Sequence, residues 1–168
     1  IQLLIMNGFD PGAGEDPFKV FEYTSFQERA TRISHTETGR IAKQQGDESL
    51  YKICTIIAKD EARHESFYKS CMKEIFNIDP NGATTSYAWM IKKNISMPAR
   101  LMGDGKNPNL FNDFAAAAEH VGVYTARDYP EIISHLNDEW CISNVKVTTV
   151  EASKAQEYLL NIPGRYLK

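Results

Sequence analysis

Apolar residues recur every three or four positions along most of this 168-residue chain, which is the spacing of helices with one buried face. Clusters of glycine, proline and aspartate interrupt the pattern at regular intervals. The pattern predicts the tail of one helix ending at Gly8, two long helices over about residues 17–45 and 47–76, and shorter helices over about 83–94, 109–121, 128–141 and 149–161. The one strand-like stretch, 145–150, is short and polar, so the predicted fold class is all-α.

Several helix ends carry recognisable signals. Gly46 is placed to end the first long helix, and Asp47 is placed to cap the second. Thr125 and Asp128 form a pair similar to a capping box. Pro130 follows closely, and we expect it to delay the start of that helix.

The second long helix carries a stripe of mostly apolar residues at alternating spacings of four and three. This spacing is typical of a face that packs into a helical bundle. The stripe consists of Leu50, Cys54, Ile57, Glu61, His64, Tyr68, Cys71 and Ile75. A carboxylate and an imidazole thus interrupt it, and leaving such groups buried without partners costs roughly 2–7 kcal/mol.

Glu61 and His64 lie one turn apart on the same helix face, so both side chains can reach one metal ion or a pair of ions. The alternative is an accidental match on a solvated face, because the chain has 22 acidic residues and four histidines. The central position of the two residues in the apolar stripe favours the metal site.

Glu28 lies on the preceding long helix, where the pattern is less decisive. One candidate face that contains Glu28 is polar, whereas another, with Phe26 and Ala30, is apolar. By pattern alone Glu28 is a solvated acid. The remaining histidines are expected at exposed positions, near helix ends or in ordinary hydrogen bonds; they are His35, His120 and His135.

Composition narrows the classes of protein to consider. With 42% apolar and 24% charged residues, the chain is expected to form one soluble globular unit, and no apolar run is long enough to cross a bilayer. The three cysteines are odd in number and lack a CxxC spacing, which favours a reducing compartment over a disulfide framework. A net charge of -3 without a basic stripe gives no indication of nucleic-acid binding.

Five motifs resemble those of the plant-type soluble acyl-acyl carrier protein desaturases, the stearoyl desaturases among them. They are YTSFQERATRISH at 23–35, DEARHE at 60–65, KKNISMPARLMGDG at 92–105, NLFNDF at 109–114 and GVYTARDY at 122–129. The resemblance is specific because the motifs follow the family's order and span nearly the whole chain. It implies that residues 1–168 form a single partial domain, the second half of a ferritin-like helical bundle with the helices that follow it.

The resemblance also implies a cofactor. In this family a di-iron centre takes one lone Glu from each of two helices and a Glu-x-x-His from each of two others. Glu28 then corresponds to a lone ligand, Glu61 to a bridging ligand, and His64 to the imidazole on the same Fe2+ ion. Thr31 corresponds to a catalytic residue near the oxygen site that donates a hydrogen bond or a proton.

The implied activity is O2-dependent removal of two hydrogens from an acyl chain on acyl carrier protein, which forms a cis double bond in fatty acid biosynthesis. Ferredoxin supplies electrons in this family, whose members are usually homodimers of the plastid stroma. Val20, Tyr23 and Phe111 are expected to line the acyl tunnel, and bulk at Val20 to shorten it. The acidic carrier protein is expected to dock at the basic residues Lys92, Lys93, Arg100 and Lys106.

The chain has no second Glu-x-x-His, so half of the family's ligand set is missing from it. We therefore expect a fragment that is inactive by itself, binds at most one iron and associates through its incompletely covered stripe. Two alternatives stay open. The chain could be a truncated, non-catalytic remnant that dimerises or binds acyl carrier protein, or part of another ferritin-like di-iron oxygenase that acts on a free small molecule.

Overall fold

The computed structural model describes residues 10, 13, 14, 16–96 and 98–166, so the helix predicted to end at Gly8 lies outside the described residues. Within these residues the prediction of an all-α fold is confirmed, and no strand is present. None of the described helices is long and apolar enough to cross a membrane. The helices are α2 (Pro17–Gln44), α3 (Glu48–Ile78), α4 (Pro80–Lys92), η1 (Pro98–Leu101), α5 (Leu110–His120), α6 (Asp128–Glu139), η2 (Ile142–Asn144) and α7 (Val150–Tyr166), of which η1 and η2 are single 3₁₀ turns.

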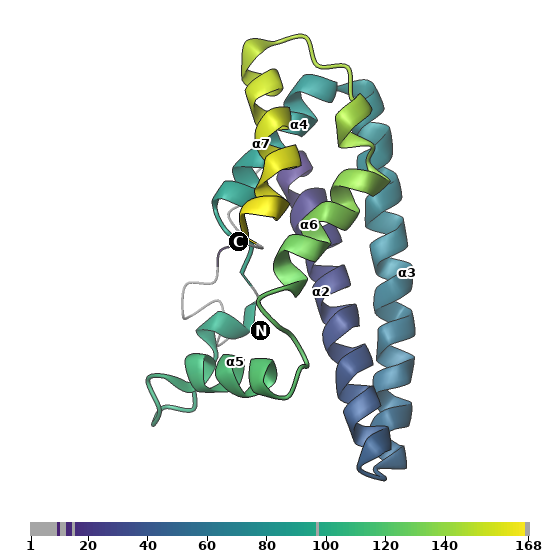
Figure 1. The fold of residues 1–168 in the computed structure, drawn as a ribbon, viewed down its shortest axis with the longest axis vertical. Helices are drawn as coiled ribbons and strands as arrows, with labels where there is room; N and C mark the ends of the chain where they lie inside the picture. Colours follow the sequence, from purple (N-terminus) through teal and green to yellow (C-terminus); the bar gives the residue numbers. More distant parts are fainter. Residues whose placement is uncertain (1–9, 11–12, 15, 97, 167–168) are drawn as a thin grey trace.

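The two longest helices, α2 and α3, form an antiparallel hairpin along the whole molecule (Figure 1). Asp16 and Asp47 cap them, since their carboxylates accept hydrogen bonds from the backbone N–H groups of Phe18 and Leu50 at 3.0 and 2.9 Å. Gly46 turns the chain between the helices with a φ of +80°, a conformation that favours glycine. The cap predicted at Asp47 and the stop predicted at Gly46 are therefore confirmed.

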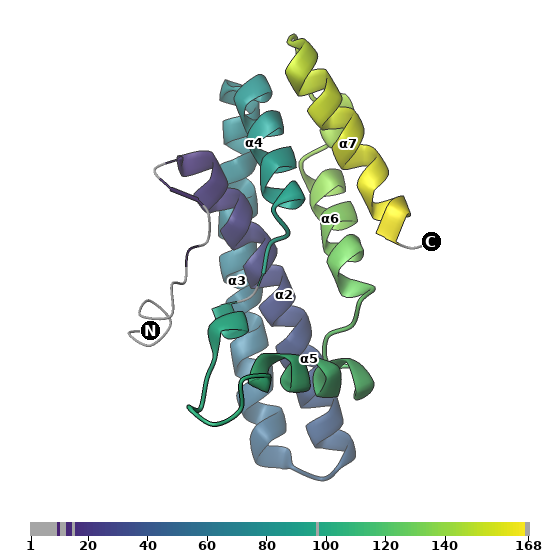
Figure 2. The same ribbon diagram turned by 90° about the vertical axis from the view of Figure 1, so that its left-hand side faces the viewer.

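The remaining helices cover parts of this hairpin. α4, α6 and α7 pack together against its upper half, whereas α5 lies beside the lower half of α2 (Figures 1 and 2). Asp79 allows α4 to follow α3 directly, because its carboxylate accepts a hydrogen bond from the Gly82 N–H at 2.8 Å. A Cβ atom on Gly82 would clash with that carboxylate, so a side chain there would displace the cap.

A core of buried apolar side chains lies where α2, α3, α4, α6 and α7 meet. Tyr87 is fully buried in it and contacts Trp140, with 4.9 Å between the ring centroids. The other large, fully buried apolar residues are Phe26 at 2% exposure, Met72, Met90, Ile91, Ile132, Ile133, Leu136, Ile142 and Leu159. This core fixes the positions of the upper half of the hairpin.

α6 and α7 each run past a proline. The sequence predicts a delayed helix start at Pro130, and Pro163 lies beyond the predicted end of the last helix. The expectation that Pro130 delays its helix is wrong: α6 begins at Asp128, because a proline in the first turn lacks an N–H that would have no helical acceptor anyway. α7 likewise continues past Pro163. The Leu159 carbonyl, which Pro163 cannot bond, accepts a hydrogen bond from the Asn137 side chain at 2.7 Å.

The face of α3 that packs most deeply differs from the predicted stripe. Of the eight stripe residues only Cys54 is buried, while Leu50 is 40% exposed and the His64 side chain is 56% exposed. In the second half of the helix, α4 and α6 pack on the adjacent face, so most of the stripe stays incompletely covered within the described residues. The buried residues of α3 are Cys54, Glu65, Met72 and Phe76.

Glu22 is a carboxylate in the core between α2 and α4. Ser86 donates a hydrogen bond to one of its oxygens at 2.9 Å. Within the described part of the chain, its other oxygen and the hydroxyls of Ser25 and Tyr87 have no hydrogen-bond partner. Burial raises the pKa of Glu22 well above its usual value, although the hydrogen bond from Ser86 opposes this shift.

Replacing Glu22 with Gln should stabilise the fold at neutral pH. An acid whose pKa is raised by folding stabilises the protein below its unfolded pKa and loses this contribution as the pH rises through the folded pKa. Glu22→Gln should therefore raise the free energy of unfolding by roughly 1–3 kcal/mol at about pH 8, with the difference shrinking toward about pH 4. Urea unfolding at both pH values measures this, with the exposed Glu48→Gln as the control; equal stabilities at the higher pH would contradict it.

Candidate metal centre

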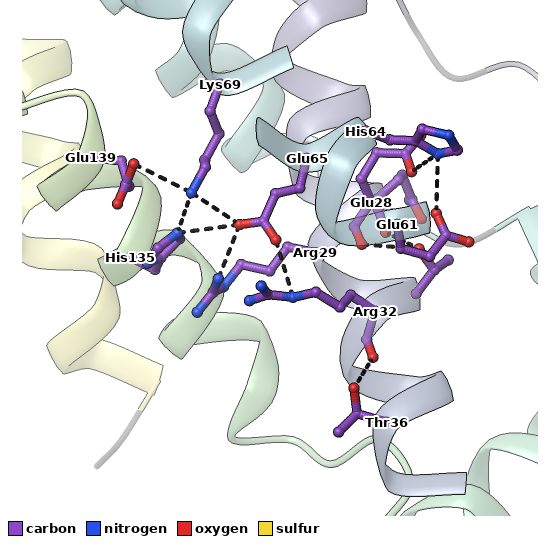
Figure 3. Close-up of polar contacts among 12 residues, drawn as sticks. Glu28, Arg29, Arg32, Thr36, Glu61, His64, Glu65, Lys69, His135 and Glu139 are labelled. Carbon is purple, nitrogen blue, oxygen red and sulfur yellow. Dashed lines mark hydrogen bonds and ion pairs between the residues drawn. The ribbon is translucent and has the colours of Figure 1, made fainter. Parts of the chain in front are cut away.

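α2 and α3 bring Glu28, Glu61 and His64 together on one side of the hairpin (Figure 3). One donor atom from each residue lies within 4.8 Å of the others. His64 Nδ1 is 3.1 Å from Glu28 Oε2 and 3.6 Å from Glu61 Oε2. The spacing on α3 therefore does place the carboxylate and the imidazole side by side, and α2 adds the second carboxylate.

The carboxylates of this cluster are mostly shielded from solvent, whereas the imidazole is open. The Glu28 and Glu61 side chains are each 18% exposed, and that of His64 is 56% exposed. The interpretation of Glu28 as a solvated acid, made from the pattern alone, is therefore wrong. The polar face of α2 turns toward α3, so the motif resemblance was the better guide.

The electrostatics of the cluster favour a bound cation. The pKa of Glu28 is raised to about 7, first by burial and then by the hydrogen bond and charge of Glu61, while His64 opposes the rise. Two carboxylates this close need a proton or a positive charge between them. A divalent cation meets that need, and two carboxylates with one imidazole are a donor set that suits non-haem iron. The three residues thus fit Fe2+ as part of a ligand set.

Thr31 lies one turn beyond Glu28 on α2. Its hydroxyl donates to the backbone carbonyls of Gln27 and Glu28, at 3.0 and 3.1 Å, so it is engaged on its own helix. Val20, near the start of α2, is 43% exposed. The structure does not bring Val20 into the three-residue cluster.

An apolar cavity of about 720 Å³ lies between α2, α5 and the start of α6. Phe111 lines it together with Phe26, Phe114 and Tyr124. Tyr23 lies next to it, because its hydroxyl is 3.4 Å from the carbonyl of Ser96, another lining residue. Burial raises the pKa of the Tyr23 hydroxyl to about 12, so it stays protonated. The size and lining of the cavity suit an apolar ligand.

The basic residues expected to bind a carrier protein are exposed and follow one another from the end of α4 to the loop before α5. Lys92 lies over the ring of Tyr158 at 4.9 Å, and Lys93 over that of Trp89 at 5.2 Å. Arg100 also lines the apolar cavity, and Lys106 lies farther along the loop.

A second polar cluster, on the neighbouring face of α3 that turns toward α6, was missed from the sequence (Figure 3). Its centre is Glu65, whose side chain is 2% exposed. His135, expected near a helix end or on an exposed face, lies in the last part of α6 and is 25% exposed, with its Nε2 atom 2.9 Å from Lys69 Nζ and 3.3 Å from Glu65 Oε1. Shifting the predicted stripe by one residue after Glu61 would have found Glu65. His35 lines the apolar cavity, and His120 is exposed at the end of α5.

Comparison with known proteins gives consistent matches over the whole chain. The profile of a family described as "Fatty acid desaturase" matches residues 1–168. The chain is 47% identical to the chloroplastic stearoyl-[acyl-carrier-protein] 9-desaturase of Gossypium hirsutum over 165 residues, 98% of this chain and 42% of that protein. It is 47% identical to the chloroplastic stearoyl-[acyl-carrier-protein] 9-desaturase 1 of Arabidopsis thaliana over 168 residues, 100% of this chain and 43% of that protein. It is 43% identical to the acyl-[acyl-carrier-protein] 6-desaturase of Thunbergia alata over 168 residues, 100% of this chain and 43% of that protein. The chain thus spans less than half the length of these relatives.

Proposed function

Since the chain belongs to the fatty acid desaturase family, we propose that it is part of an acyl-[acyl-carrier-protein] desaturase and holds one half of its di-iron site. The family has a ferritin-like fold, and the α2–α3 hairpin is part of such a bundle. The observation that carries the proposal is the convergence of Glu28, Glu61 and His64 within 4.8 Å on two neighbouring helices. The family's Glu-x-x-His and lone Glu supply this same donor set.

The residues of the cluster have distinct roles in this proposal. Glu28 and Glu61 supply negative charge that offsets the charge of Fe2+, and His64 supplies a neutral nitrogen ligand. Iron held there would activate O2, the oxidant that accepts the two hydrogens removed from an unactivated pair of methylene groups, which no amino-acid side chain can do. Thr31 acts as a proton or hydrogen-bond donor on the same side of α2, for which its hydroxyl must turn from the carbonyls of Gln27 and Glu28.

The substrate in this proposal is a saturated acyl chain attached to acyl carrier protein. The three relatives described above are named for acyl groups on that carrier, with desaturation at position 9 or 6. The apolar cavity beside Phe111 would hold the chain and exclude water from it, with Tyr23 next to it. Val20 would line a further part of the acyl tunnel, as the motif resemblance implies. The product is a cis-unsaturated acyl chain.

The remaining assignments follow from family membership. Ferredoxin would deliver the electrons, two copies of the complete protein would form a homodimer, and the plastid stroma would be the compartment. The printed names of the Gossypium and Arabidopsis relatives include the word chloroplastic, which supports the last assignment.

Carrier docking predicts a loss of affinity on charge reversal. Lys93→Glu combined with Lys106→Glu should weaken binding of the acidic acyl carrier protein by about three- to tenfold at low salt and reduce its salt dependence, because exposed charges steer association. Fluorescence anisotropy with labelled carrier protein measures both effects. Lys52→Glu with Lys73→Glu, two exposed positions on α3, is the matched control. An unchanged affinity of the first variant would reject this docking surface.

A product assay separates this function from its alternatives. The chain joined to the upstream segment of its relatives, supplied with reductant and O2, should remove two hydrogens from carrier-linked stearate, a mass change that mass spectrometry resolves. Free stearate should react far more slowly, since the carrier would supply much of the binding energy. Equal turnover of free substrate would favour a different di-iron oxygenase. Binding of carrier protein without iron or product would favour a non-catalytic remnant.

A further inference from the structure

The buried cluster around Glu65 contains the residues that directly follow two of the candidate metal ligands. Arg29 follows Glu28 on α2, and Glu65 follows His64 on α3. Arg29 Nη1 donates a hydrogen bond to Glu65 Oε1 at 3.0 Å, so these neighbours are paired across the two helices. Successive residues point about 100° apart around a helix, which places the ion pair on one side of the hairpin and the ligands on another (Figure 3).

Glu65 is held by more than one partner. Arg32 Nε lies 3.2 Å from its Oε2 atom and Lys69 Nζ lies 3.1 Å from its Oε1 atom. His135 of α6 approaches the same Oε1 atom at 3.3 Å. The Glu65 side chain is only 2% exposed. If its carboxylate moved, the arginine and lysine charges would lose their partner in a site shielded from water, which is unfavourable. Glu65 therefore fixes α2, α3 and α6 relative to one another.

The ligand side has no comparable constraint. Glu28 shares a hydrogen bond with Glu61, but their negative charges oppose this contact. The His64 side chain is 56% exposed, and its ion-pair contacts in the described part of the chain are to these two carboxylates. Sliding or rotating α2 against α3 by one residue would separate Glu28 from His64. Contacts elsewhere on the hairpin therefore help to hold Glu28 against His64, and the Arg29–Glu65 pair is the polar contact between α2 and α3 that adjoins both ligands in the sequence.

We propose that Glu65, through Arg29 and Arg32 of α2, Lys69 of α3 and His135 of α6, is a positioning residue that sets the register of Glu28 against His64 before any metal binds. The inference rests on the proposed function for the identity of the ligands, but the register itself can be measured without metal. Groups that orient metal ligands from behind commonly change metal affinity about 10–100-fold.

The test uses the variants Glu65→Gln and Arg29→Lys, and it includes measurements without metal and with Co2+. In the metal-free 168-residue chain, nuclear Overhauser contacts should join the His64 ring protons to the Glu28 side chain, and Glu65→Gln should abolish them. Titration with Co2+ alone should then show at least about tenfold weaker binding for Glu65→Gln. Arg29→Lys keeps the charge but lacks the guanidinium, and we expect an intermediate loss of affinity.

Two controls separate positioning from general stability. Met72→Ala removes a fully buried side chain from the same helix, and Glu37→Gln removes a carboxylate that pairs with Arg40 on the outside of α2. Both should keep the His64–Glu28 contacts and bind Co2+ within about twofold of the original chain. A folded Glu65→Gln variant that keeps the His64–Glu28 contacts would overturn the inference. If that variant does not fold, an unchanged Co2+ affinity of Arg29→Lys would overturn it instead. A chain that shows the contacts but binds no Co2+ would refute the metal centre and leave the register result standing.

Discussion

Replacing Glu61 with Gln or His64 with Ala should lower the affinity of the chain for Fe2+ or Co2+ by roughly 100-fold or more, since even residues behind the ligands change affinity 10–100-fold. Each change removes one of the three ligand groups that the described residues bring together, with donor atoms within 4.8 Å of one another. Glu28→Gln should have a similar effect. Calorimetric or optical titration with Co2+ measures the loss under anaerobic conditions.

The controls for this prediction are residues of the same types at exposed positions. Glu74→Gln on α3 and His120→Ala at the end of α5 remove a carboxylate and an imidazole outside the cluster. They should bind Co2+ as the original chain does. Equal affinities for Glu61→Gln, His64→Ala and these controls would show that the metal binds elsewhere or not at all.

The second large effect concerns activity: the isolated chain should form no unsaturated product, and the upstream segment of its relatives should restore turnover. The family's centre takes ligands from four helices, and this chain supplies a lone Glu and one Glu-x-x-His. Without the rest, a second iron has too few ligands to bind. The expected difference is therefore all or none.

Structural features support this dependence on further helices. Leu50, Ile53, Ile56 and Phe67 of α3 are between 40% and 62% exposed, which is unusual for so many large apolar side chains on one helix. The assay compares the chain alone with the extended protein, using carrier-linked stearate, ferredoxin and O2. The extended protein with Glu61→Gln serves as the inactive control. Formation of unsaturated product by the chain alone would refute the proposal that it holds only half of the di-iron site.

Helix positions and the Glu61–His64 pair could be predicted from the sequence because they depend on local spacing. Both long helices lie within a few residues of the predicted bounds, and the pair shares a face in any helix. Pro163 shows the limit of this approach. The helix continues there because Asn137, distant in the sequence, binds the carbonyl of Leu159.

The burial of the residues around the candidate site could not be predicted, because it depends on which helices pack together and the spacing of apolar residues does not show this. Glu28 appears solvated by pattern and is half-buried because α3 covers its face. Glu65 lies outside the predicted stripe, yet α6 brings His135 to it and two arginines of α2 complete the cluster. Only the motif resemblance pointed to Glu28 in advance, and only a shift of the stripe by one residue after Glu61 would have pointed to Glu65.

The number of metal ions bound per chain tests the central claim most directly. Elemental analysis after anaerobic loading with Fe2+ should give at most one iron per isolated chain, and Glu61→Gln or His64→Ala should remove it. The chain extended by the upstream segment should bind two. Two irons per isolated chain, retained in both variants, would contradict the claim that Glu28, Glu61 and His64 form one half of a di-iron centre.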